Sequence, residues 1–402
     1  MDLHIIILVC ALLMMVYGSV SRLCDNYFVT GPMIFAFIGI ALSHSVDDYL
    51  GLASHTDVIK FIAEITLIIV LFIDASEIKH KKPSPGTPKV PLRLLAIGLP
   101  LTAIAGIAFG FIIFESLSIA TIALVAFMLT PTDAALGQPL IKSEELPEHI
   151  KQNISVESGL NDGLILPPII ICIAVLSGEI GNSSDTTWAM FIATQLILGP
   201  IVGASVGWLG GRFVEHAVHK KWMAPLYQSI CALALPLLAY SGAEMVEGNG
   251  FIAAFVCGYF FGVRDHGVRI KVQQFGEAEG QQLTLFVFLL FGFVMVPIAS
   301  EYWDLKALGY AILSLTIVRM IPVFLSLLGT KLSWREQVIY AWFGPRGIAS
   351  ILYLLMFISM LGFEGHQYPV GVIVLTVLLS IVLHGVSALP IVKWYERYAS
   401  RH

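Results

Sequence analysis

Long apolar segments, separated by short polar breaks, fill this sequence from one end to the other. A run of roughly 17–25 apolar residues is long enough to cross the hydrocarbon core of a bilayer as a helix. The chain is 57% hydrophobic and only 13% charged, whereas ordinary soluble domains are about 25% charged. Because backbone in lipid must satisfy its own hydrogen bonds, the sequence predicts an all-α polytopic membrane protein.

We expect about thirteen transmembrane helices on this length criterion. Their predicted ranges are 4–21, 27–43, 58–78, 92–111, 115–137, 152–177, 187–213, 223–242, 248–263, 282–299, 305–328, 335–361 and 369–392. The first segment has no basic region or small-residue cleavage pattern, which favours a membrane helix over a cleaved signal peptide. We expect one transmembrane domain over 1–402, with 393–402 as a short tail and no soluble regulatory domain.

Basic residues orient the chain across the membrane. They gather in alternate loops, such as the one that contains Lys79, Lys81 and Lys82, whereas the opposite loops are richer in acidic residues. The positive-inside rule then places the C-terminal tail in the cytoplasm and the N-terminus outside a plasma (inner) membrane. This orientation requires an odd number of spans, which agrees with the predicted count.

Two predicted spans are interrupted near their centres. The fifth contains TPTD at 130–133 and the twelfth contains GPRG at 344–347. The two prolines lie 214 residues apart (131 to 345), as expected if 4–177 and 223–392 form inverted six-helix repeats joined by a linker helix over 187–213. Ordinary proline kinks are the alternative. Irregular backbone at membrane depth is tolerated only where it is buried or lines a cavity.

Two aspartates, Asp133 and Asp162, lie within these apolar segments. A carboxylate at that depth costs roughly 2.5–3.5 kcal/mol on insertion scales, and such residues usually handle ions or protons. Around Asp162 the sixth span carries further polar residues, which form one wedge because residues four apart share a helix face. Oxygen ligands of this kind suit hard cations rather than the metals that prefer Cys or His. The candidate ion- and proton-binding residues are Asp162, Asp133, Thr132, Ser158, Asn161 and Asp74.

A buried network that only fixes helix packing is the alternative to an ion site. Two arginines, Arg319 and Arg346, also lie within predicted spans, and each needs a counter-ion there. Glu157 is the natural partner, and we favour Arg319 over Arg346 for this structural ion pair. Asp74 lies near the cytoplasmic end of the third span, where it is either a funnel carboxylate or a residue that reaches the interface.

The TPTD motif at 130–133 and the ESGLND motif at 157–162 of the sixth span, together with the intramembrane arginines, resemble the NhaP-type (CPA1) sodium/proton antiporters of the cation/proton antiporter superfamily. The resemblance covers most of the chain and implies the NhaA/NhaP-like fold with broken crossing helices. It implies that Asp162 carries the cation and the proton, and that Thr132, Ser158 and Asp162 ligate Na⁺ with help from Asp74 or water. A homodimer with an elevator-like movement of a core bundle is also implied.

Further roles follow only from this resemblance. Asp133 would cap the broken helix ends, and Glu157 with Arg319 would form the family's ion pair. Asn161, where electrogenic relatives carry a second aspartate, implies electroneutral exchange. The family often has a proline after TPTD, where this chain has Ala134.

The resulting hypothesis is a secondary active transporter that exchanges Na⁺ (or Li⁺) for H⁺ by competition at one carboxylate. We expect no enzymatic activity and no cofactor; the partners are membrane lipids and a second copy of the chain. The net charge of −5 without a basic block gives no support to nucleic-acid binding. A K⁺/H⁺ antiporter on the same scaffold, a cation channel and an intramembrane enzyme are the alternatives, although His384 alone does not supply a catalytic site.

Overall fold

The computed structural model of the protein describes residues 3–24, 29–43, 56–78, 89–137, 140, 143, 146–178, 185–262 and 266–399. Within these ranges the chain is helical almost throughout and forms no β-strand. The basic residues Lys79, Lys81 and Lys82, which orient the predicted topology, lie outside the described residues.

The helices follow the order of the predicted apolar segments. They are α1 (Leu3–Cys24), α2 (Gly31–Ser43), α4 (Thr56–Glu77), α5 (Lys89–Arg93), η1 (Leu94–Gly98), α6 (Leu99–Ile113), α7 (Ile119–Met128), η2 (Ala134–Gly137), α9 (Glu148–Leu176), α10 (Asp185–His219), α11 (Pro225–Glu244), α12 (Gly250–Gly262), α13 (His266–Leu290), η3 (Phe291–Met295), α14 (Val296–Ser300), α15 (Leu305–Leu315), α16 (Ile317–Ser326), α17 (Trp334–Trp342), α18 (Ile348–Leu361) and α19 (Gln367–Ala399). By length and composition, 7 helical stretches of the described chain are able to cross a membrane, and further apolar helices are shorter. The protein is therefore a multi-pass membrane protein, while the count of thirteen spans stays a prediction.

The tenth segment differs most from its predicted bounds. The sequence predicts a span over 282–299, but α13 already begins at His266. Its first half is too polar for a hydropathy window to mark it, and tertiary packing on α4 holds it in place. Gln273 donates to a backbone carbonyl of α4 over 2.8 Å, and a Cβ at Gly276 would lie 2.2 Å from the side chain of Ile73.

Three interruptions divide the helices near the centre of the protein. As the sequence predicts, α7 ends at Met128 before the short η2 helix, and α17 ends at Trp342 before α18 begins at Ile348. A third interruption at Thr316 separates α15 from α16, where the backbone leaves helical geometry at φ −113° and ψ −93°. Neither glycine nor proline marks this position, so the sequence did not predict it.

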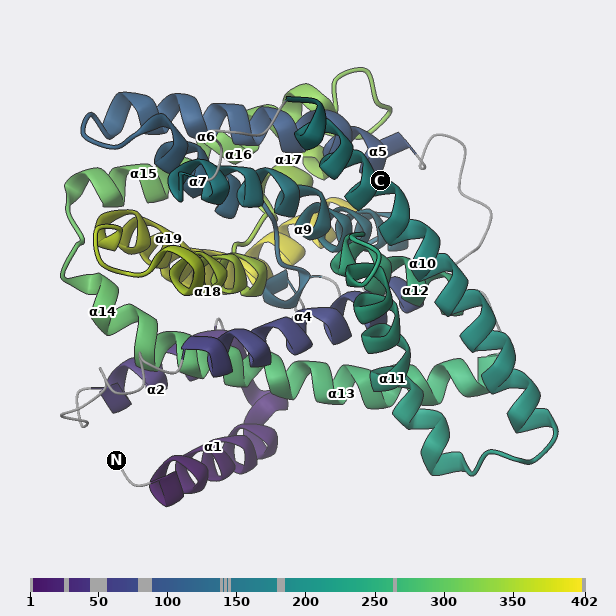
Figure 1. Ribbon diagram of the computed structural model, residues 1–402. Coiled ribbons are helices and arrows are strands. Elements are labelled where there is room, and N and C mark those ends of the chain that lie inside the picture. The colour runs from purple at the N-terminus through teal and green to yellow at the C-terminus, as the bar shows by residue number, and fades with distance from the viewer. Residues whose placement is uncertain are drawn as a thin grey trace.

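Helices α4, α10, α11, α12 and α13 pack against one another around one apolar cluster, and we call them the scaffold helices. Figure 1 shows α10 and α11 at one side of the molecule and α13 running across its lower part, above α1. The α10–α12 contact is close because Gly199, Gly203 and Gly207 recur every four residues. A Cβ at these glycines would lie 2.7, 2.3 and 2.4 Å from backbone oxygens around α12, and such small-residue contacts are typical of membrane helices.

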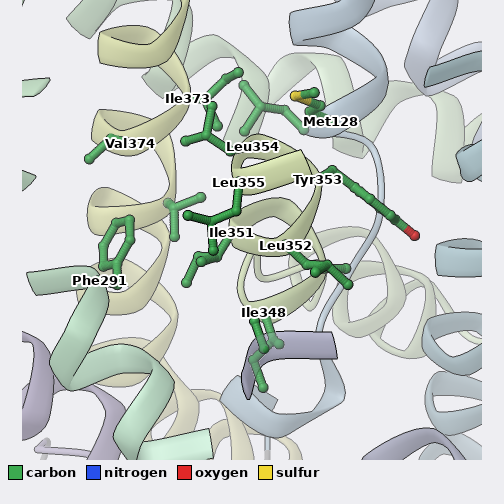
Figure 2. Packing of buried hydrophobic residues seen from close by; sticks show 14 of the residues in the cluster. Met128, Phe291, Ile348, Ile351, Leu352, Tyr353, Leu354, Leu355, Ile373 and Val374 are labelled. Atoms are coloured by element: carbon green, nitrogen blue, oxygen red, sulfur yellow. The ribbon is translucent and has the colours of Figure 1, made fainter. Parts of the chain in front are cut away.

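Helix α18 lies in the main apolar core beside α19. Its side chains Ile348, Ile351 and Leu355 point into a cluster that also includes residues of α7, α19 and η3 (Figure 2). The ring of Tyr353 projects from the side of α18 that faces away from α19 (Figure 2). This side of α18 meets α9, where the polar residues gather.

Candidate functional site

The two predicted breaks meet in space through Asp133. The backbone N–H of Asp133 donates to the carbonyl of Pro345 over 2.7 Å, and the Asp133 carboxylate accepts from the N–H of Ile348 over 2.7 Å. Asp133 therefore caps the N-terminus of α18, where a negative charge is favoured. A Cβ at Gly347 would lie 2.0 Å from this carboxylate, so only glycine permits the close approach.

Arg346 connects the second break to the first. Its side chain is fully buried, and Nη1 donates to the carbonyls of Thr130 and Pro131, the latter at 3.0 Å. These carbonyls have lost their helical partners because α7 ends at Met128. The guanidinium of Arg346 thus satisfies backbone groups that the first break exposes.

Glu157 forms an ion pair with Arg319 rather than with Arg346. Arg319 Nη2 lies 2.5 Å from Glu157 Oε1, and the two residues are only 1% and 2% exposed. The interruption at Thr316 precedes Arg319 by one helical turn and sets the direction of α16. Arg319 also donates weakly to the carbonyl of Tyr340 at 3.4 Å.

Ser158 and Asn161 of α9 both contact the first break. The Ser158 hydroxyl donates to the carbonyl of Thr132 over 2.7 Å and accepts from the N–H of Ala134 over 2.8 Å. The Asn161 amide donates to the Thr132 hydroxyl over 2.7 Å. A proline at position 134 would lack the donor that Ala134 provides. Ser158 thus has one lone pair left for a ligand.

Asp162 lies beside this network with an unsatisfied oxygen. Its side chain is 3% exposed, and its Oδ1, like Asn161 Oδ1, accepts no hydrogen bond from the described part of the chain. Buried polar groups are almost always satisfied in proteins, and an isolated buried carboxylate is very costly. The arrangement therefore suits a ligand that neutralises the carboxylate, either a proton or a cation.

Further residues fix the backbone around Asp162. Tyr353 of α18 donates to the carbonyl of Asp162 over 2.6 Å, and Asn249, just before α12, donates to the carbonyl of Gly163 over 2.9 Å. Neither residue was predicted from the sequence. Tyr353 lies in an apolar run that gives no signal, whereas Asn249 between Gly248 and Gly250 is a polar interruption that a closer reading could have singled out.

Asp74 lies on α4, half-buried and three residues before the helix ends at Glu77. The charges of Asp74 and Asp133 both act on the carboxyl group of Asp162. The three carboxylates are therefore electrostatically coupled, although the role of Asp74 along an ion path stays a prediction. Among the described residues, no group of three or more His, Cys, Asp and Glu side chains forms a metal site, so other oxygens would have to contribute ligands.

The sequence profile of a family described as "sodium/hydrogen exchanger, transmembrane" matches residues 6–394. The chain belongs to this family of sodium/hydrogen exchangers. The resemblance of the TPTD and ESGLND motifs to NhaP-type antiporters is thereby confirmed at the level of the family, whose members are transporters.

Two similar sequences support membership of this family. The chain is 24% identical over 374 residues to the K⁺/H⁺ antiporter NhaP of Alkalimonas amylolytica, covering 92% of this chain and 63% of that protein. It is 22% identical to the Na⁺/H⁺ antiporter of Schizosaccharomyces pombe, covering 75% of this chain and 70% of the relative. The chain thus spans less than two thirds of the length of the first of these relatives.

The fold of the protein matches a solved antiporter structure. The sodium/proton antiporter MjNhaP1 from Methanocaldococcus jannaschii superposes with a TM-score of 0.76, covering 98% of this chain and 100% of the other. The sequences are only 18% identical, so this likeness concerns the fold. The predicted NhaP-like antiporter fold is confirmed.

Proposed function

We propose that this protein is an antiporter that exchanges Na⁺ (or Li⁺) for H⁺ across a membrane by alternating access, with Asp162 as the shared binding residue. One observation carries the proposal: a buried carboxylate oxygen of Asp162 and a buried amide oxygen of Asn161 have no hydrogen-bond partner in the described chain. Oxygen atoms of this kind are the ligands that hard alkali cations prefer. The Thr132 hydroxyl, which is bonded to Asn161, is placed to join them.

Coupling follows from the energetic cost of a bare carboxylate. When neither a proton nor a cation occupies Asp162, its charge opposes movement through the apolar contacts of α9 and α12, because desolvating an unpaired charge is strongly unfavourable. Either ligand removes that penalty, and the two cannot bind together at one oxygen set. One cation is therefore exchanged for one proton, and the neutral amide of Asn161 agrees with electroneutral exchange.

Several features of this antiporter complete the proposal. The inverted repeats over 4–177 and 223–392 would move the broken helices relative to the scaffold helices in an elevator-like step, within a homodimer in a plasma membrane. The N-terminus would lie outside and the tail from 393 inside. No cofactor and no enzymatic step are needed, because the transported ions themselves neutralise the site. Asp74 would contribute to the cation path on the cytoplasmic side.

Exchange of K⁺ for H⁺ is the second candidate. The observation that favours it is the similarity over 92% of the chain to a relative described as a K⁺/H⁺ antiporter. Both cations would use the same oxygen atoms, so the two candidates differ in the fit of the site rather than in mechanism.

The test is transport by the purified protein in liposomes with an imposed pH gradient. Na⁺, Li⁺ and K⁺ are added in turn, and a trapped pH-sensitive dye reports the internal pH. Na⁺-driven dissipation that is unaffected by clamping the membrane voltage supports electroneutral Na⁺/H⁺ exchange, whereas a response to K⁺ alone selects the second candidate. No response to any cation from folded protein refutes the proposal.

Asp162→Asn should abolish this exchange without unfolding the protein. The control is Asp57→Asn, which removes a carboxylate from the exposed start of α4, about 25 Å along the helix from Asp74. We expect the control to transport like the wild type. Residual coupled exchange in Asp162→Asn would show that another residue carries the ions.

A further inference from the structure

Helix α19 presents a polar stripe to the second break. Ser380, His384 and Ser387 are spaced by four and three residues, so they share one face of the helix. Ser380 and His384 are almost fully buried. The end of α17 lies against this stripe: Trp342 donates from its indole N–H to the Ser387 hydroxyl over 2.9 Å, and its ring lies 5.4 Å from the His384 ring.

The stripe satisfies backbone groups that the break exposes. The backbone N–H of Arg346 donates to the Ser380 hydroxyl over 2.6 Å. His384 Nε2 lies 3.0 Å from the carbonyl of Trp342, the last carbonyl of α17, which also accepts from the N–H of Gly344 over 2.8 Å. The break is therefore held by α19 on one side, as Asp133 holds it on the other.

The imidazole of His384 contacts α19 through one ring nitrogen and the end of α17 through the other. Its Nδ1 lies 3.0 Å from the carbonyl and 3.2 Å from the hydroxyl of Ser380, while its Nε2 lies 3.0 Å from the carbonyl of Trp342. The positive charges of Arg346 and Arg319 both act on the ring, and a third positive charge would be repelled. The other titratable groups near the break are Glu157, on the far side of Arg319, and Asp133.

The held backbone determines where the Arg346 side chain lies. With its N–H on Ser380, Arg346 extends its guanidinium to the carbonyls of Thr130 and Pro131. The next residue, Thr132, is bonded to Asn161. Hydrogen bonds, together with the backbone of residues 130–132, therefore connect α19 through Arg346 to the oxygens beside Asp162.

We propose that Ser380 and His384 are positioning residues for the cation site: they hold the second break through its backbone, and through Arg346 they set the geometry of Thr132 and Asn161. This inference rests on the proposed antiport function. It assigns a role to a histidine and a serine that touch neither the cation nor Asp162.

The experiment measures initial exchange rates against cation concentration in proteoliposomes for Ser380→Ala, His384→Leu and His384→Gln. The matched control is Thr376→Val, one turn earlier on α19. Thr376 is equally buried, but within the described chain its hydroxyl bonds only to the Val372 carbonyl of its own helix, over 2.7 Å. Each deletion removes one or two buried hydrogen bonds of about 1 kcal/mol each, which corresponds to roughly tenfold in affinity.

Ser380→Ala and His384→Leu should each raise the apparent KM for the cation about tenfold while the maximal rate stays within about twofold of the wild type. His384→Gln should restore most of the affinity, because its amide N–H reaches the carbonyl of Trp342. Thr376→Val should match the wild type. An unchanged KM in both deletions, an equal rise in the control, or a lower maximal rate at unchanged KM overturns the inference.

A second measurement separates this inference from the proposed function. Hydrogen exchange of the peptide over 343–349 should be faster in Ser380→Ala than in Thr376→Val, because the Arg346 N–H has lost its acceptor. If the wild type transports no cation, the proposed function fails. Equal hydrogen exchange of this peptide in the two variants would then show that α19 does not hold the break either. Wild-type transport with equal hydrogen exchange overturns the positioning role alone.

Discussion

Neutralising Glu157 should destabilise the protein far more than it changes ion choice. Arg319 is 1% exposed, its Nε and Nη1 have no hydrogen-bond partner in the described chain, and Glu157 Oε1 at 2.5 Å is the carboxylate that it contacts. Removing one member of a buried ion pair typically costs about 3–5 kcal/mol, because the remaining charge is left uncompensated. Glu157→Gln keeps an oxygen acceptor, so we expect a loss of stability at the lower end of this range, about 3 kcal/mol.

The chain offers a matched control for this substitution. Glu336 also forms an ion pair, with His149 at 2.8 Å, but the two side chains are 13% and 36% exposed. Pairs that water reaches contribute about 0–1 kcal/mol, so Glu336→Gln should change stability little. The free energy of unfolding is measured by reversible denaturation in mixed micelles, followed by tryptophan fluorescence.

A loss in Glu157→Gln no larger than in Glu336→Gln would refute the reasoning. A changed order of preference among Na⁺, Li⁺ and K⁺ would show instead that Glu157 belongs to the ion site. The double variant Glu157→Leu/Arg319→Met should regain most of the lost stability, because an apolar pair of similar volume leaves no buried charge.

Two other perturbations test the site itself. Gly347→Ala places a Cβ 2.0 Å from the Asp133 carboxylate, so the cap of α18 must shift and the exchange rate should fall roughly tenfold to a hundredfold; Gly309→Ala, with nothing within 4 Å, is the control. Competition at Asp162 predicts that the apparent KM for the cation rises by up to about tenfold for each unit of falling pH, since proton and cation bind one site by mass action. A KM that does not depend on pH would mean that they bind separately.

Hydropathy and helix-breaking residues predicted most of the architecture. Apolar runs locate helices because the transfer cost of each side chain is a local property. The breaks at 130–133 and 344–347 are visible because proline lacks an N–H wherever it occurs. Helix α13 begins well before the predicted span at 282 because its first half is polar, and packing on α4 at Gly276, rather than hydropathy, holds that half in place.

The polar residues of the site were also identifiable from the sequence. Asp133, Asp162 and Glu157 stand out because a carboxylate in an apolar segment is costly whatever surrounds it. Helical spacing further predicted that Ser158 and Asp162 lie on one face. These inferences need no knowledge of the partner helices.

Only the tertiary structure decided which groups contact one another. Glu157 pairs with Arg319 because the unpredicted interruption at Thr316 directs α16, whereas Arg346 is held at the first break by carbonyls that no sequence pattern reveals. Tyr353 and His384 gain their partners only because α18 and α19 pack beside the breaks. A sequence states the cost of burying each polar group, but the groups that satisfy it lie on other helices, between 42 and 191 positions away for Glu157, Tyr353 and His384, and only the fold brings them together.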